Sequence, residues 1–205
     1  MSMIVGDPGT VEHVLAERSR TGAERFDEVW DGVYFVSPNP NNLHQKLLSR
    51  LVLLMEAVVD ADRLGETLLT VNITDRGDDW TKNYRIPDLA VFLNGTSAEN
   101  RITHWLGGPD FAVEILSPGD RAREKLDFYA RVGVREVLLI DRAPWRLELF
   151  RRAEGRLAPV AAVGPDDPEA ALVSAILPLR FRLTPGDPRP TIEAEHADGL
   201  RRWTI

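Results

Sequence analysis

The period of the hydrophobic pattern changes along the chain, and each change predicts a different element. Leucines and valines recur every three or four residues between positions 43 and 58, which is the spacing of one buried helix face. Between 67 and 74 hydrophobic and polar residues alternate, as in a strand with one buried face. The run at 110–116 is almost wholly apolar, which is typical of a central strand covered on both faces.

Turn and cap residues divide these runs into elements. Asp31-Gly32 lies between two β-rich runs and predicts a tight hairpin, because glycine tolerates positive φ. Asn41 or Asn42 is a candidate N-cap for the long helix, and Asp120 for a later one. The predicted elements are a short helix within 1–21, a hairpin at 26–36, a helix from 41 or 42 to about 62, strands at 67–74, 86–93 and 110–116, a helix at 120–132, and strands at 136–141, 145–151 and 156–163.

This order predicts an α/β (α+β) protein with a mixed β-sheet flanked by helices. The core order is αβββαβ, with an N-terminal hairpin before it and extra C-terminal strands after it. One helix joins the strand at 110–116 to that at 136–141, which indicates a right-handed parallel crossover. We expect a single domain over residues 1–205. Its core covers about 25–152, and the polar segments 1–21 and 191–205 are peripheral.

Composition narrows the class of protein. The chain has 205 residues, 43% of them hydrophobic and 28% charged, which is typical of a soluble globular protein. No apolar run approaches the roughly 18 residues that cross a bilayer, and the first ten residues do not resemble a signal peptide. We therefore expect a cytoplasmic protein with no membrane partner. Cysteine is absent, which excludes disulfides and thiolate chemistry.

The net charge of −7 argues mildly against a general nucleic-acid coat protein. It does not exclude a nuclease, because only the surface near the site must attract phosphate and a bound metal adds positive charge. The chain has no P-loop, no dinucleotide-binding glycine fingerprint, no G-x-S-x-G and no H-E-x-x-H motif.

Glu114 is the residue that packing explains least. It lies in the middle of an apolar strand, on the same side as Ala112 and Leu116. Burying an unpaired carboxylate costs several kcal/mol. Glu114 must therefore be paired, protonated, bound to a cation or facing a cleft. A salt bridge to an arginine inside the fold is the structural alternative.

Asp88 becomes a candidate metal ligand because of its expected position next to Glu114. A Pro-Asp pair such as Pro87-Asp88 is by itself a common way to begin a strand. The second acid, however, lies on the next apolar strand, and adjacent strands are about 4.8 Å apart. Two carboxylates at that spacing can hold a hard divalent ion such as Mg²⁺ or Mn²⁺.

Lys125 is informative through its position on the predicted helix. At about 100° per residue, Ala122, Leu126 and Tyr129 share the inward face, and Lys125 lies at the edge of that face. A lysine there can snorkel, with its stem on the core and its ammonium in water. Alternatively the ammonium points toward the two acids, where it would position a water and stabilise charge developing on phosphorus.

Glu28 and His44 are accessory candidates. Glu28 precedes the hairpin turn and could instead be a solvated strand-edge acid, and His44 could be a surface or capping residue of the long helix. A candidate surface for stacking on bases and contacting phosphates precedes Asp88, although an anchored loop is the alternative; its residues are Trp80, Lys82, Tyr84 and Arg85. Arginines could form a weak patch that contacts the nucleic-acid backbone, or they could lie along a solvated strand edge. They are at positions 142, 146, 151, 152 and 156.

The sequence motifs around these residues resemble those of a known family. A Pro-Asp strand, an acid on the next strand, a nearby lysine and a crossover helix resemble the PD-(D/E)XK nuclease superfamily. Over about 25–152 the chain is similar to its Uma-two branch of putative restriction endonucleases. The matching segments are Asp31-Gly32, His44-Gln45, Pro87-Asp88, Glu114-Ile115-Leu116-Ser117-Pro118 and Lys125-Leu126…Tyr129-Ala130…Gly133-Val134.

The resemblance implies a restriction-endonuclease-like fold and a Mg²⁺- or Mn²⁺-dependent endonuclease acting on DNA. Asp88, Glu114 and the backbone carbonyl of Ile115 would be metal ligands, and Lys125 the catalytic lysine. An acid at Glu28 also matches the family pattern, and a homodimer follows by analogy. Leu116 stands where the superfamily usually has its lysine. Two alternatives are a non-catalytic binding or regulatory protein with the nuclease fold, and a metal hydrolase of small phosphodiesters.

Overall fold

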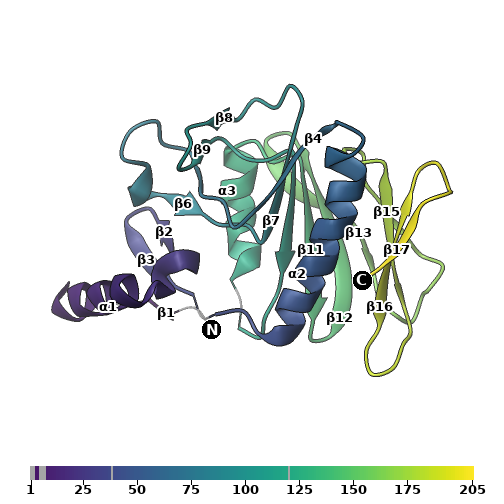
Figure 1. Ribbon diagram of the computed structural model, residues 1–205, viewed down its shortest axis with the longest axis horizontal. Coiled ribbons are helices and arrows are strands. Elements are labelled where there is room, and N and C mark those ends of the chain that lie inside the picture. Colours follow the sequence, from purple (N-terminus) through teal and green to yellow (C-terminus); the bar gives the residue numbers. More distant parts are fainter. Residues whose placement is uncertain (1–2, 5–7, 38, 120) are drawn as a thin grey trace.

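A six-stranded mixed sheet forms the centre of the protein (Figure 1). The computed structural model describes residues 3–4, 8–37, 39–119 and 121–205. In spatial order the central strands are β13 (Arg156–Val163), β12 (Trp145–Ala153), β11 (Glu136–Arg142), β10 (Phe111–Ile115), β7 (Leu89–Leu93) and β4 (Gly65–Leu69).

The predicted αβββαβ core is confirmed. Its members in chain order are α2 (Asn42–Met55), β4, β7, β10, α3 (Leu126–Arg131) and β11. β10 pairs with β11 in parallel and with β7 in antiparallel fashion, so the two strands that carry the candidate acids are neighbours. The predicted fold class is therefore the observed one.

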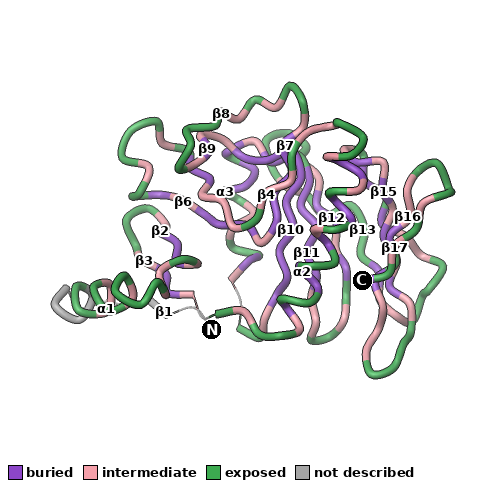
Figure 2. The backbone as a smooth tube through the Cα atoms, in the orientation of Figure 1, coloured by how far each residue is buried: buried purple, intermediate pink, exposed green. Residues whose placement is uncertain are grey.

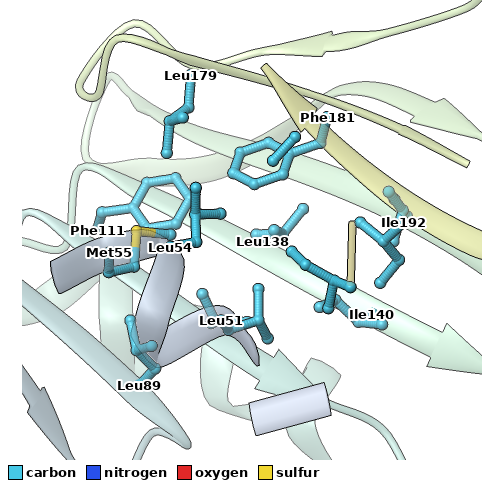
Figure 3. Close-up of a cluster of buried hydrophobic side chains, with 14 of the residues drawn as sticks. Leu51, Leu54, Met55, Leu89, Phe111, Leu138, Ile140, Leu179, Phe181 and Ile192 are labelled. Carbon is cyan, nitrogen blue, oxygen red and sulfur yellow. The ribbon is translucent and has the colours of Figure 1, made fainter. Parts of the chain in front are cut away.

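The two helices cover opposite faces of this sheet. Because successive strand residues point to opposite faces, Val113 and Ile115 pack with α2, whereas Ala112 and Leu116 pack with α3. The larger cluster joins α2, the sheet and the C-terminal strands (Figure 3). Figure 2 shows the central strands buried and most connecting loops exposed. Glu114 lies on the α3 face of the sheet.

The N-terminal hairpin is also confirmed. Asp31 and Gly32 both have positive φ, at 49° and 86°, as a type I′ turn requires. The hairpin strands belong to a second sheet. Its strands, in spatial order, are β1 (Met3–Ile4), β3 (Val33–Val36), β2 (Glu28–Trp30), β6 (Tyr84–Arg85), β5 (Ile73–Thr74), β9 (Trp105–Leu106) and β8 (Glu99–Asn100).

Three of the element boundaries predicted from the sequence were wrong. The predicted strand at 67–74 is two strands, because Thr70 adopts a φ of 48° and turns the chain out of the central sheet after β4. The helix expected at 120–132 begins as the 3-10 turn η4 (Ala122–Lys125) and continues as α3. Its proposed cap, Asp120, lies outside the described residues. The strand expected at 86–93 begins at Leu89, after Pro87.

The helical segments differ from expectation mainly at their ends. The short helix expected within 1–21 is α1 (Pro8–Thr21), and the 3-10 turn η1 (Ala23–Phe26) follows it. Asn41 caps α2 by accepting a hydrogen bond from the His44 N–H, and the π-turn η2 (Glu56–Asp60) extends the helix. A further 3-10 turn, η3 (Trp80–Lys82), lies in the loop before β6. No helix in the described ranges is long and apolar enough to cross a bilayer.

The C-terminal segment contributes more to the core than its polar pattern indicates. It forms a four-stranded antiparallel sheet that lies at the opposite end of the molecule from α1 in Figure 1. Ile192, Ala194 and Ile205 of this sheet are buried in the same cluster as α2. Its strands are β14 (Leu172–Val173), β15 (Leu179–Thr184), β16 (Thr191–His196) and β17 (Arg202–Thr204).

Candidate active site

One cavity gathers the catalytic, metal-ligand and accessory candidates from the sequence. It has a volume of about 300 Å³. The β2–β3 hairpin, the start of α2, the segment before β7, the end of β10 and the turn η4 supply its walls. The six sequence-predicted residues that line it are Glu28, His44, Asp88, Glu114, Ile115 and Lys125.

Asp88 is held at the entrance to β7 by two contacts to one oxygen. The backbone N–H of Ile115 donates to its Oδ2 at 2.7 Å, and Nε2 of His44 lies 3.1 Å from the same atom. The Ile115 contact joins the carboxylate to the end of β10. Asp88 is thus fixed beside Glu114 by the pairing of the two strands, and its side chain remains 21% exposed to the cavity.

Glu114 is buried, with a side chain 6% exposed, and it too is held through one oxygen. Nζ of Lys125 lies 3.0 Å from Oε1, and the Tyr129 hydroxyl donates to that same Oε1. Burial raises the pKa of Glu114; Lys125 opposes the rise, and the carboxylates of Asp88 and Glu28 add to it. The cation that pairs with Glu114 is therefore a lysine, and the alternative of a buried arginine was wrong.

Lys125 points inward, so the snorkelling alternative was wrong as well. Its side chain is 12% exposed. Nζ lies 2.8 Å from Oε1 of Glu28, and it donates to the Ile86 carbonyl at 3.4 Å. The ammonium thus sits between two carboxylates that come from different sheets.

Glu28 and His44 are both buried, contrary to the surface alternatives. The Ile86 N–H donates to Oε1 of Glu28 at 2.8 Å, and Nε1 of Trp30 donates to Oε2 at 2.7 Å. These bonds hold Glu28 against the segment that leads to Asp88. His44 directs Nε2 at Asp88, while its buried Nδ1 has no hydrogen-bond partner among the described residues.

Sequence reasoning missed the role of two buried residues. Tyr129 was placed on the inward face of the helix without a partner; a buried tyrosine hydroxyl facing a buried acid is the signal that could have found it. Arg85 lies between the rings of Trp30 and Phe128, at 4.4 and 4.3 Å from their centroids. Burial lowers the pKa of Arg85 to about 10, and Glu28 opposes this shift.

The sequence indicated two further surfaces that could contact nucleic acid, the loop around Trp80 and the arginines between 142 and 156. Residues of both make contacts within the protein. The Trp80 ring stacks on His104 at 4.7 Å and meets Tyr84 edge-on at 5.3 Å, which favours the anchored loop. Several of the arginines that could have formed a patch have protein partners instead. Arg151 pairs with Glu136, and Arg146 pairs with Glu148.

The carboxylates of the cavity suit a hard divalent cation. Among the described residues three acids, one lysine and one arginine line it, and there Oδ1 of Asp88 and Oε2 of Glu114 accept no hydrogen bond. The described residues contain no group of three or more acidic, histidine or cysteine side chains placed to hold a metal ion, so an ion here would need the two carboxylates together with backbone and water oxygens. Two carboxylates, one backbone carbonyl and water would fit Mg²⁺, which usually keeps several waters.

Comparisons with known proteins identify a family and a related fold. The model of a family described as "Uma2: Putative restriction endonuclease" matches residues 15–186. A solved structure of a putative nuclease belonging to DUF820 from Anabaena variabilis superposes with a TM-score of 0.59 and 22% identity. The superposition covers 73% of this chain and 82% of that one. At this identity the likeness concerns the fold. The search of curated proteins found no match.

Proposed function

Because the chain belongs to the Uma2 family of putative restriction endonucleases, we propose that it is a metal-dependent endonuclease that hydrolyses phosphodiester bonds in DNA. The observation that carries this proposal is the single cavity that holds Asp88, Glu114 and Lys125 together. Two acids, each with one oxygen that accepts no hydrogen bond from the described residues, and an inward-pointing ammonium would suit the hydrolysis of a charged ester.

Each residue has a distinct role in this proposal. Asp88, Glu114 and the backbone carbonyl of Ile115 hold the ion. A bound Mg²⁺ or Mn²⁺ would supply an activated water and neutralise charge on the scissile phosphate. Lys125 orients the attacking water and stabilises the negative charge that develops on phosphorus.

The neighbouring residues position these groups. Glu28 and Glu114 hold the Lys125 ammonium from two sides, which fixes its position. His44 orients Asp88 through Nε2, and Tyr129 orients Glu114 through its hydroxyl. Hydrogen bonds to ligand carboxylates of this kind typically change metal affinity or activity 10–100-fold.

A non-catalytic binding protein with the nuclease fold is the second candidate. Leu116 stands at the usual lysine position of the superfamily, and Lys125 is engaged by two carboxylates. In this case the ammonium would only balance buried charge. Such a protein would bind DNA without cutting it.

Nicking of supercoiled plasmid with Mg²⁺, Mn²⁺ or EDTA tests the proposal. We expect cutting only with the divalent ions, and a loss of at least about 100-fold in Asp88→Asn and Lys125→Met. Matched controls are Glu66→Gln and Lys46→Met, which change exposed residues on β4 and α2. Both controls should cut like the wild type.

Calorimetric titration with Mn²⁺ separates the two candidates. A saturable site that is lost in Asp88→Asn and Glu114→Gln supports the enzyme. Metal-independent cutting, or cutting that survives in both Asp88→Asn and Lys125→Met, would contradict the mechanism. DNA binding without metal binding or cutting would favour the second candidate.

The assembly also belongs to the proposal. Cutting both strands of DNA is simplest with two copies of the site, so we propose a homodimer. Light scattering after gel filtration measures the molar mass. The monomer has a mass of 23.0 kDa, and the dimer would have twice that.

A further inference from the structure

The catalytic groups lie deep in a small cavity. Its volume of about 300 Å³ is at the lower end of the range for sites that bind one small ligand. Side chains of Glu28, Glu114 and Lys125 are only 5%, 6% and 12% exposed. A phosphate must therefore enter the cavity to reach them, since it cannot meet them at the surface.

One wall of the cavity, the β2–β3 hairpin, is fixed to the rest of the protein. Its Gly32 N–H donates to the Lys82 carbonyl at 2.8 Å, and its Asp31 N–H donates to Oδ1 of Asn83 at 3.0 Å. The Ile86 N–H adds a bond to Glu28 at 2.8 Å. These contacts hold the hairpin over the carboxylates from its tip to its base.

Aromatic rings and one arginine line the cavity beside this hairpin, and the arginine, Arg121, also pairs with Glu124. Phe26 and the stacked pair of Trp30 and Phe35, 4.2 Å between centroids, line the cavity. The Arg121 guanidinium lies 4.8 Å from the Phe35 centroid at the rim. Rings and a guanidinium suit the bases and phosphates of a single strand, because every base has a π-face for stacking.

Paired DNA fits this geometry poorly. In a duplex the phosphates of each strand follow one another every 3.4 Å along the axis, and each carries a base that is stacked and paired. A scissile phosphate can enter the cavity only if its backbone leaves the surface of the duplex. An unpaired nucleotide does so without the unstacking cost of a few kcal/mol that a paired one pays.

We propose that the site takes a phosphodiester in an unpaired stretch of DNA, such as a single strand, a flap or a bubble, in preference to one inside intact duplex. Phe26 presents its ring to a neighbouring base, and Arg121 contacts a neighbouring phosphate. The inference rests on the proposed nuclease function and names the substrate class of the same site.

Three end-labelled DNAs that share one labelled strand test the preference: the single strand, the fully paired duplex, and the duplex with a central bubble. With Mn²⁺ and the full chain, we expect the single strand and the bubble to be cut at least about 10-fold faster than the duplex. Cuts in the bubble substrate should fall within its unpaired stretch. Equal rates on all three DNAs would overturn the inference and leave the nuclease function intact.

Binding gives a readout that does not depend on cutting. Fluorescence anisotropy with Ca²⁺ compares the same DNAs, and we expect tighter binding of the single strand than of the duplex. If no DNA is cut but the single strand binds preferentially, the nuclease function fails and the inferred preference stands. If duplex binds as tightly as single strand, the preference fails.

Variants of the wall sharpen the test. Phe26→Leu keeps an apolar side chain but removes the ring, and it should weaken single-strand binding about 5-fold or more. Phe26→Tyr keeps the ring and should bind the single strand as tightly as the wild type does. Val33→Ala, at a hairpin residue that is 44% exposed, is the matched control and should bind as the wild type does. Unchanged single-strand binding in Phe26→Leu would overturn the stacking role.

Discussion

Two buried glutamates on adjacent strands have opposite surroundings. Glu136, at the start of β11, is fully buried, and donors reach both of its oxygens. Nε of Arg151 and the Ala175 N–H donate to Oε1 at 2.6 and 3.0 Å, and the Ser174 hydroxyl donates to Oε2 at 2.5 Å. Glu114, on β10, lines a cavity, and within the described ranges it is bonded through Oε1 only.

The difference separates a structural acid from a candidate ligand. Glu136 uses its bonds to join the C-terminal sheet to the central sheet, because Ser174 and Ala175 lie directly after β14. No donor in the described part of the chain reaches Oε2 of Glu114, which is the oxygen proposed to bind the metal ion. Burial alone therefore does not identify a site; unbonded oxygens that face a cavity do.

The largest expected effect is on stability at Glu136. Glu136→Ala removes the acceptor of three donors and leaves the buried hydroxyl of Ser174 without its acceptor. We expect a loss of about 3–5 kcal/mol in the free energy of unfolding, measured by urea denaturation. The melting temperature should fall by about 2–4 °C for each kcal/mol.

Activity per folded molecule is the control for Glu136→Ala. It should match that of the wild type, because Glu136 is not among the residues that line the cavity. A loss of stability below about 1 kcal/mol would show that the three bonds do not hold the C-terminal sheet in place.

The next effect is on metal binding at Glu114. Glu114→Gln keeps the shape of the side chain and removes its charge, so we expect Mn²⁺ affinity to fall more than about 100-fold in calorimetry. Stability without metal should change little, because burial already disfavours the charged form of Glu114 and Lys125 still pairs with Glu28. If Glu114→Gln were destabilised like Glu136→Ala but still bound Mn²⁺, Glu114 would be a structural acid like Glu136 and not a metal ligand.

A smaller effect is expected at Tyr129. Tyr129→Phe removes the hydroxyl that donates to Oε1 of Glu114 and leaves the ring in the core. We expect a 10–100-fold loss of metal affinity or cutting rate with little change in fold by circular dichroism. Phe128→Leu, a change on the same helix at a ring without a hydroxyl, serves as the packing control. Equal metal affinity in Tyr129→Phe and the wild type would remove Tyr129 from the site.

The smallest effect is a pH dependence of stability. Burial raises the pKa of Glu114 above its ordinary value of 4.5, so the folded protein holds this proton more tightly than the unfolded chain does. Its contribution to stability is fully present below pH 4.5 and is lost as the pH rises through the raised pKa. The slope reaches about 1.4 kcal/mol per pH unit at most.

Melting temperatures in EDTA across pH 4–9 measure this dependence. The wild type should lose more stability with rising pH than Glu114→Gln, which has no proton to release. Parallel curves for the two proteins would contradict the raised pKa. Saturating Mg²⁺ should reduce the difference, because a bound cation favours the ionised carboxylate.

The sequence predicted the elements and the candidate acids because both depend on local properties. The spacing of leucines in α2 and the apolar run of β10 follow from the geometry of a single helix or strand. Glu114 was found because the cost of burying a charge does not depend on the details of its neighbours. The positions of Asp88 and Lys125 followed from strand pairing and helix phase.

Other features depend on contacts between distant segments, and the sequence pattern did not predict them. Thr70 continues the alternation of the β4 segment, yet its positive φ sends the next residues to another sheet. Ile192 and Ala194 lie in a polar-looking tail, and they become core only because the strand packs against α2. No local period encodes these arrangements.

The sequence by itself determined the family, the αβββαβ core and the acids that needed a partner. Only the tertiary structure decided which partners they have. Glu28 reaches Lys125 from another sheet, Tyr129 reaches Glu114 from the crossover helix, and Glu136 is fully paired by the C-terminal segment. The physical reason is that a side chain's period and desolvation cost are set locally, whereas a hydrogen-bond partner is set by how the whole chain folds.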